Sequence, residues 1–213
     1  MRRSRLAWSL CLLALLVAPA FGGKKVGYMR KPGSDAVAGF SVIPAADKCA
    51  SWGWAAATES ILALDKVAVD QHVLVQRAFG GELCVDDGLD LRALGDIVAG
   101  EYVIGPRKKM RVVTRVFPAG AIGAEDIIAA VRRGRPIILF WKMRPYVVSA
   151  AAYDEYIGPR GTRLFDIREL TLLDPSDPGT PVSFVKQDND LRELNGAMEF
   201  VLFPMEEVEW VPQ

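Results

Sequence analysis

Histidine and cysteine are scarce in this chain of 213 residues, and their scarcity excludes several kinds of chemistry. The sequence holds one histidine, His72, and three cysteines, Cys11, Cys49 and Cys84. These residues do not form a spaced ligand set of the kind that binds zinc. The acidic runs Asp86-Asp87 and Asp188-Asn189-Asp190 lack the alternating pattern of a calcium loop, and no glycine-rich phosphate or dinucleotide motif is present. We therefore expect no metal and no cofactor.

An excess of charge of one sign is also lacking. The chain carries 26 basic and 26 acidic residues. No basic block is long enough to indicate a nucleic-acid partner, and we expect none. Half of the residues, 51%, are hydrophobic, which is enough for one full core and favours a single domain.

The N-terminus has the pattern of a secretory signal peptide over residues 1–20. Three arginines among the first five residues precede an apolar run, Leu6–Val17, and Ala18-Pro19-Ala20 forms a small-x-small cleavage site. The alternative is an uncleaved anchor, but the run is too short to span a membrane comfortably. We expect cleavage near Ala20, no remaining membrane span and a secreted or periplasmic protein. Because the removed segment holds three basic residues and no acidic ones, the mature chain has a formal charge of −3.

Two cysteines remain after that cleavage, Cys49 and Cys84. An even pair in an oxidising compartment predicts a disulfide between them. The alternative is two separate buried thiols.

Helical patterns fill the first half of the chain and strand patterns fill the second. Residues 21–38 are glycine-rich and basic, and we expect a flexible leader there, followed by one domain over residues 39–213. Within it the patterns predict a short strand at 40–43 and helices at 54–64, 70–78, 90–99 and 124–133. They also predict strands at 110–117, 136–143, 146–156, 163–173, 182–185 and 197–203, and a short helix at 188–194. The sequence thus predicts the α+β class, with a helical half packed against an antiparallel sheet.

The stretch Cys49–Lys66 is the most distinctive in the chain. Its run Trp52-Gly53-Trp54-Ala55-Ala56 resembles the papain-like cysteine peptidases, in particular the bacteriocin-peptidase-like bacterial branch with Trp-Cys-Trp-Ala-Ala before a long helix. Three further motifs resemble that branch in the same order: Gly134-Arg135-Pro136, Tyr153-Asp154 and Asp174-Pro175. The resemblance covers about residues 40–205 and implies a papain-like fold with a cleft for an extended peptide.

The resemblance also implies that the catalytic residues are replaced. Gly53 stands at the nucleophile position, and Tyr146, counted back from Tyr153-Asp154, stands at the histidine position. Asp47 stands where a glutamine forms part of the oxyanion hole, and an ionised carboxylate cannot donate a hydrogen bond. Asp174 stands at the position of the residue that orients the histidine. It is the only one of these four positions that holds a residue typical of the family.

Three functions are compatible with this pattern. The first is an exported, inactive homologue that binds a peptide, or an envelope or secreted protein, in the residual cleft, which Trp52 and Trp54 would line. The second is an active thiol hydrolase that uses Cys49 in a different arrangement. The third is a structural domain whose cleft is filled by Trp52, Trp54 and Tyr146.

Overall fold

The structure is a computed structural model that describes residues 28–40, 45–81, 84 and 90–206. The helices of this part are α1 (Gly53–Leu64), α2 (Gln71–Phe79), α3 (Leu91–Val98) and α4 (Ala124–Arg132). A 3₁₀ turn, η1 (Leu191–Glu193), precedes the last strand. The strands are β1 (Met29–Ala36), β2 (Gly100–Gly105), β3 (Lys108–Pro118), β4 (Ile137–Trp141), β5 (Arg144–Ile157), β6 (Arg163–Asp174), β7 (Asp177–Val185) and β8 (Leu194–Glu206).

The eight strands form one open antiparallel sheet in the order β2-β3-β8-β4-β5-β6-β7, with β1 paired to β5 beyond the end of β4. Every strand pair is antiparallel. The prediction of an α+β architecture with an antiparallel sheet is therefore confirmed.

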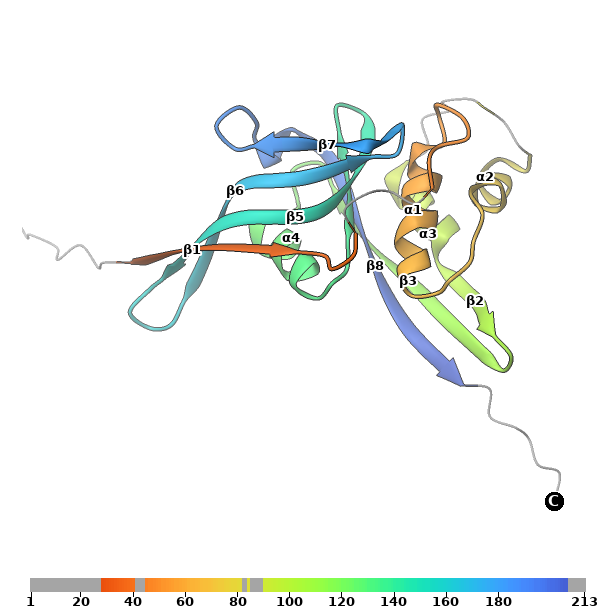
Figure 1. Cartoon of the computed structure of the whole chain (residues 1–213), viewed down its shortest axis with the longest axis horizontal. Coiled ribbons are helices and arrows are strands. Elements are labelled where there is room, and N and C mark those ends of the chain that lie inside the picture. Colours follow the sequence, from red (N-terminus) through yellow and green to blue (C-terminus); the bar gives the residue numbers. More distant parts are fainter. Residues whose placement is uncertain (1–27, 41–44, 82–83, 85–89, 207–213) are drawn as a thin grey trace, which may run out of the picture.

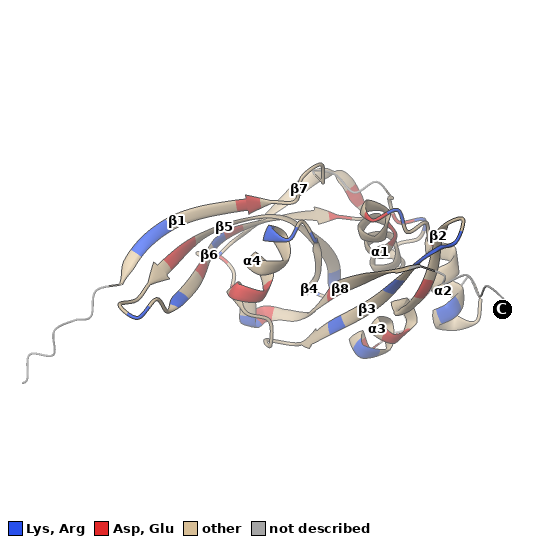
Figure 2. Cartoon of the chain, turned by 90° about the horizontal axis from the view of Figure 1, so that it is seen from below, with Lys and Arg blue, Asp and Glu red and all other residues tan. Residues whose placement is uncertain are grey.

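Helices cover both faces of the sheet. On one face lie α1, which contacts β4 and β5, and α3, which contacts β3 and β8. On the other lies α4, which contacts β1, β4, β5 and β6. Figure 1 shows α1, α2 and α3 gathered at one end of the molecule. Figure 2 shows α4 beneath the curve of β1, β5 and β6. We call the two surfaces of the sheet the α1 face and the α4 face.

Local sequence explains the ends of two helices. The side chains of Asp70 and Asp90 accept hydrogen bonds from the backbone N–H of His72 and Arg92, which caps α2 and α3. Gly80, with φ of 72°, ends α2 in the left-handed conformation that glycine adopts without strain.

Helix α1 begins without a side-chain cap. Asp47 and Ser51 are nearby polar residues, but the N-cap is Trp52 and no side chain caps the helix. Core packing determines where this helix begins, because Gly53, Trp54 and the three alanines that follow are all buried.

The expected flexible leader is wrong for residues 29–36, which form β1. Arg30 donates to the Asp154 carboxylate at 2.7 Å, and Arg132 donates to that of Asp35 at 2.8 Å. Backbone pairing with β5 and these ion pairs hold the segment against the sheet.

Strand β2 was not predicted. Of the expected strand at 40–43, Phe40 is buried in the core and the rest lies outside the described residues. The helix expected at 188–194 is only the turn η1.

No helix among the described residues is long and apolar enough to cross a membrane.

Candidate functional site

The N-terminus of α1 is the first candidate site, because it holds the nucleophile position of the family that the sequence resembles. Trp52 and Gly53 are both buried there. Ala55, Ala56 and Ala57 are fully buried in the following turn, where their small side chains let other elements approach closely. A helix N-terminus can stabilise a thiolate or an oxyanion, but Gly53 supplies no side chain for that purpose.

Pro145, at the start of β5, is the residue that faces Gly53. A Cβ atom built on Gly53 would lie 3.0 Å from Cγ of Pro145, which is closer than ordinary van der Waals contact. A side chain at position 53 would therefore require Pro145 to shift by a few tenths of an ångström. The packing leaves little space at the start of α1.

Tyr146 points to the opposite face of the sheet. Successive side chains of a strand alternate between faces, so a strand that turns Pro145 towards α1 turns Tyr146 towards the α4 face. There the Tyr146 ring packs against Trp141, with 5.8 Å between ring centroids, and Trp141 packs against Phe184 at 5.2 Å. Tyr146 is 7% exposed. The structure thus places Tyr146 within an aromatic row on the α4 face and leaves Pro145 against Gly53.

Asp174, at the end of β6, is held in a polar network with Arg144. An Arg144 guanidinium nitrogen lies 3.2 Å from Oδ2 of Asp174 and donates to Oγ of Ser176 at 3.0 Å. The Ser176 hydroxyl in turn donates to Oδ2 of Asp47 at 2.9 Å, and its backbone N–H donates to Oδ1 of Asp174 at 2.8 Å. Asp47 and Asp174 are thus brought together through Ser176. Arg144 thus occupies the position beside Asp174 that a catalytic histidine would require. The arginine side chain stays protonated and cannot act as a base.

The two tryptophans expected to line a cleft are part of the core. Trp52 is 4% exposed and Trp54 is 7% exposed. Trp52 also meets the ring of His72 edge-on, with centroids 4.8 Å apart. Neither indole offers a surface to a ligand. Their burial disfavours the expectation that both line a cleft.

Cys49 and Cys84 form a disulfide, as predicted, with their Cα atoms 5.9 Å apart. The bridge ties the segment before α1 to the chain after α2. While it is intact, Cys49 has no thiolate with which to attack a substrate. Among the described residues, no group of His, Cys, Asp and Glu is arranged to hold a metal ion.

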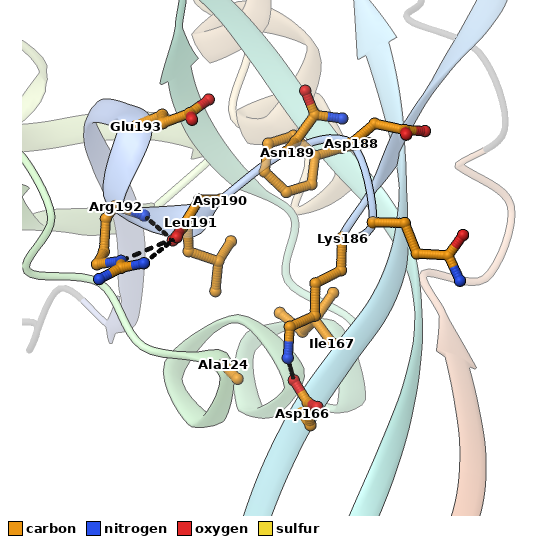
Figure 3. Close-up of a pocket in the computed structure, with 12 residues that line it drawn as sticks. Ala124, Asp166, Ile167, Lys186, Asp188, Asn189, Asp190, Leu191, Arg192 and Glu193 are labelled. Atoms are coloured by element: carbon orange, nitrogen blue, oxygen red, sulfur yellow. Dashed lines mark hydrogen bonds and ion pairs between the residues drawn. The ribbon is translucent and has the colours of Figure 1, made fainter.

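A cavity of about 520 Å³ lies on the α4 face, away from Gly53. The start of α4, strands β6 and β7 and the segment through η1 form its walls (Figure 3). Its apolar surface comes from Ala124, Ile167, Phe184 and Leu191. Its polar rim consists of Asp166, Lys186, Gln187, Asp188, Asn189, Asp190, Arg192 and Glu193. The sequence did not predict this cavity, because nothing in the local pattern at 188–190 indicates that β6 and α4 lie beside it.

Ion pairs set the charge state of the groups around this cavity and near β1. The Arg192 side chain and backbone N–H donate to Asp190 and lower the pKa of that carboxyl to about 2. Burial alone would raise the pKa of Asp35, but hydrogen bonds from Tyr153 and Arg132 outweigh it and lower the pKa below its ordinary value. Both carboxyl groups are therefore ionised at neutral pH.

Comparison with known proteins identifies no relative: no family model, no curated protein and no solved structure matches this chain.

Proposed function

We propose that the chain is an exported, catalytically inactive homologue of the papain-like cysteine peptidases that binds a peptide or a protein without cleaving it. The order of the elements supports this proposal, because a buried helix begins at the Trp-Gly-Trp motif and an antiparallel sheet follows. The Cys49–Cys84 disulfide is compatible with export.

The contact between Gly53 and Pro145 is the observation that carries the proposal. A cysteine peptidase needs a thiolate at the helix start and a base within hydrogen-bond reach. Here the helix start has no side chain, and a proline ring, which has no ionisable group, packs against it. The nearest charged group along β5, Arg144, is already paired with Asp174. Neither nucleophile nor base is available at this position.

The active thiol hydrolase that uses Cys49 is less well supported. Its nucleophile is bonded to Cys84, and its base would have to be His72, which lies on α2 against Trp52.

A structural domain with a filled cleft is the second candidate. It is favoured by the burial of Trp52, Trp54 and Tyr146, each no more than 7% exposed. The two candidates differ in whether the protein binds a peptide at all. If it does, the burial of these rings favours a ligand site away from Gly53.

A peptide-binding assay with a parallel check for cleavage tests this function. Mature protein is titrated into pools of fluorescein-labelled decapeptides, and fluorescence anisotropy measures binding while mass spectrometry follows the peptide masses for a day. We expect saturable binding of at least one pool and no new masses. Cleavage that disappears in a Cys49→Ser, Cys84→Ser variant would favour the thiol hydrolase. Failure of every pool to bind at millimolar peptide would favour the structural domain.

A further inference from the structure

We propose that the cavity between α4, β6, β7 and η1 receives the arginine or lysine side chain of an extended peptide. This inference rests on the proposed peptide-binding function and identifies where the peptide binds and which residue it presents. It does not depend on the region around Gly53.

The size and lining of the cavity suit a long side chain with an apolar stem. Its volume of about 520 Å³ lies within the roughly 300–1,000 Å³ usual for ligand sites. Figure 3 shows Leu191 and Ile167 facing the hollow between two ion pairs. Ile167 and Phe184 are almost fully buried and form a rigid apolar wall. The methylene groups of arginine or lysine can pack on such a surface while the charged end remains at the polar rim.

The charge of the rim favours a cation. Four carboxylates line the cavity, at Asp166, Asp188, Asp190 and Glu193, against two cations, so the formal charge is −2. Both cations are already paired, Lys186 with Asp166 and Arg192 with Asp190. Asp188 and Glu193 form no hydrogen bond through their side chains and no ion pair with any described residue, and both are exposed at the rim. They are available to a guanidinium or ammonium group.

The surroundings disfavour an anion. The first turn of α4 carries Glu125 and Asp126, which oppose the attraction of the helix N-terminus for negative charge. Asp126 also accepts a hydrogen bond from the backbone N–H of Gly123 at 3.2 Å, so this N–H group is already occupied. A phosphate or carboxylate ligand would therefore meet acidic groups from two elements.

The position of β7 indicates that the ligand is an extended chain. This strand is last in the described sheet order, so its outer edge has no strand partner among the described residues. An exposed edge can pair with an extended peptide, which presents alternate side chains to nearby pockets. Phe184 near the end of β7 and Lys186 just beyond it both line the cavity. A peptide along this edge can thus place one side chain in the cavity.

Isothermal titration with matched peptides tests the inference. The probes are acetylated, amidated heptapeptides of alanine and threonine with one central arginine, and the same peptide with citrulline, which keeps the shape of arginine without its charge. We expect the arginine peptide to bind at least fivefold more tightly at low salt, with the difference shrinking as salt screens the charges. Equal affinities for the two peptides, or no binding of the arginine peptide at millimolar concentration, would overturn the assignment.

Protein variants locate the binding. Asp188→Asn with Glu193→Gln removes the two unpaired rim carboxylates and should weaken binding of the arginine peptide about fivefold or more, since exposed ion pairs contribute about two- to fivefold each. The control is Asp65→Asn, an exposed carboxylate at the end of α1, which should leave the affinity unchanged. Leu191→Trp fills the cavity and should abolish binding in a protein whose thermal unfolding shows it to be folded.

The outcomes separate this inference from the proposed function. A peptide that binds equally well to wild type and to the rim double variant would refute the cavity and leave a binding function standing. Cleavage of the bound peptide would refute the proposed inactivity, whatever the variants do to affinity.

Discussion

At the scale of single residues, ion pairs between distant segments hold β1 on the sheet. Asp35 accepts a hydrogen bond from the Tyr153 hydroxyl at 2.7 Å and is paired with Arg132 on α4. These contacts connect β1, β5 and α4 through one carboxylate. A segment that looks like an unstructured leader in the sequence is thereby part of the folded domain.

The lowered pKa of Asp35 predicts a specific pH dependence. A carboxyl whose pKa is lower in the folded chain stabilises the fold above its unfolded pKa of about 4, and this stabilisation is lost as the pH falls through the folded value. Asp35→Asn should lower the free energy of unfolding by about 1–2 kcal/mol at pH 7. The two proteins should converge as the pH falls below about 4. Urea unfolding between pH 7 and pH 3 measures this, and a constant difference over that range would contradict the role given to Asp35.

At the scale of elements, close packing of α3 on β3 depends on a glycine within the helix. A Cβ atom on Gly95 would lie 2.7 Å from Cγ2 of Val116 and 3.0 Å from Oγ1 of Thr114. Thr114 also donates to the backbone oxygen of Gly95 at 3.1 Å. The helix therefore lies nearer to the strand than any other residue at position 95 would allow.

Gly95→Ala should destabilise the protein despite the better helix propensity of alanine. The propensity gain is about 1 kcal/mol, whereas overpacking costs about 1–3 kcal/mol, so we expect a net loss of up to about 2 kcal/mol. The control is Gly81→Ala, where an added Cβ meets no atom within 4 Å and stability should be unchanged or slightly higher. Denaturant unfolding measures both variants, and equal behaviour of the two would show that α3 is free to move away from β3.

The disulfide joins two elements across a long loop. Cys49 and Cys84 are 35 residues apart in the sequence. Closing a loop of this length contributes on the order of 3–4 kcal/mol in the chain-entropy model. The Cys49→Ser, Cys84→Ser variant should lose about that much free energy of unfolding, and mass spectrometry of a non-reduced digest of the wild type should show the linked peptides. Equal free energies of unfolding for the wild type and the variant under oxidising conditions would contradict this prediction.

Local signals predicted the helices well, because caps and apolar spacing act over a few residues. Asp70 and Asp90 cap α2 and α3, both of which were predicted, and the strands from β3 to β8 lie close to their predicted places. The attachment of β1 depends on distant partners: Arg30 pairs with Asp154, which is 124 residues away in the sequence. No local sequence pattern indicates such a contact. The cavity is likewise assembled from three separate stretches of the chain, at Ala124, at Asp166 and Ile167, and from Phe184 to Glu193.

The site was harder to predict because β5 is irregular. The histidine position was counted back from Tyr153-Asp154, along a strand whose pairing with β6 shifts between Val148 and Ala150 and again between Ala152 and Tyr153. Each shift can change which side chains face a given side of the sheet. Tyr146 stays the predicted histidine position, whereas Pro145 is the residue of β5 that lies against Gly53.

At the scale of the whole molecule, the two faces of the sheet are chemically different. The α1 face is closed by buried aromatic and small residues, and the α4 face carries the cavity with its acidic rim. Figure 2 shows the positions of Lys, Arg, Asp and Glu spread along the strands and α4 and not gathered on α1. A protein arranged in this way can bind on one face while the region resembling an active site serves as core.

The central claim, that the proposed nucleophile position at the start of α1 is inert, is tested most directly by labelling with an epoxide inhibitor of papain-like enzymes. Mass spectrometry locates the label on wild type, on Gly53→Cys with Pro145→His, and on Gly53→Cys with Tyr146→His. We expect no label on the wild type and no cleavage of unfolded protein. We expect label at position 53 in the Pro145→His variant at a rate well above that of the Tyr146→His variant, because residue 145 faces residue 53. Wild-type labelling at Cys49 that abolishes a measured hydrolysis would contradict the account.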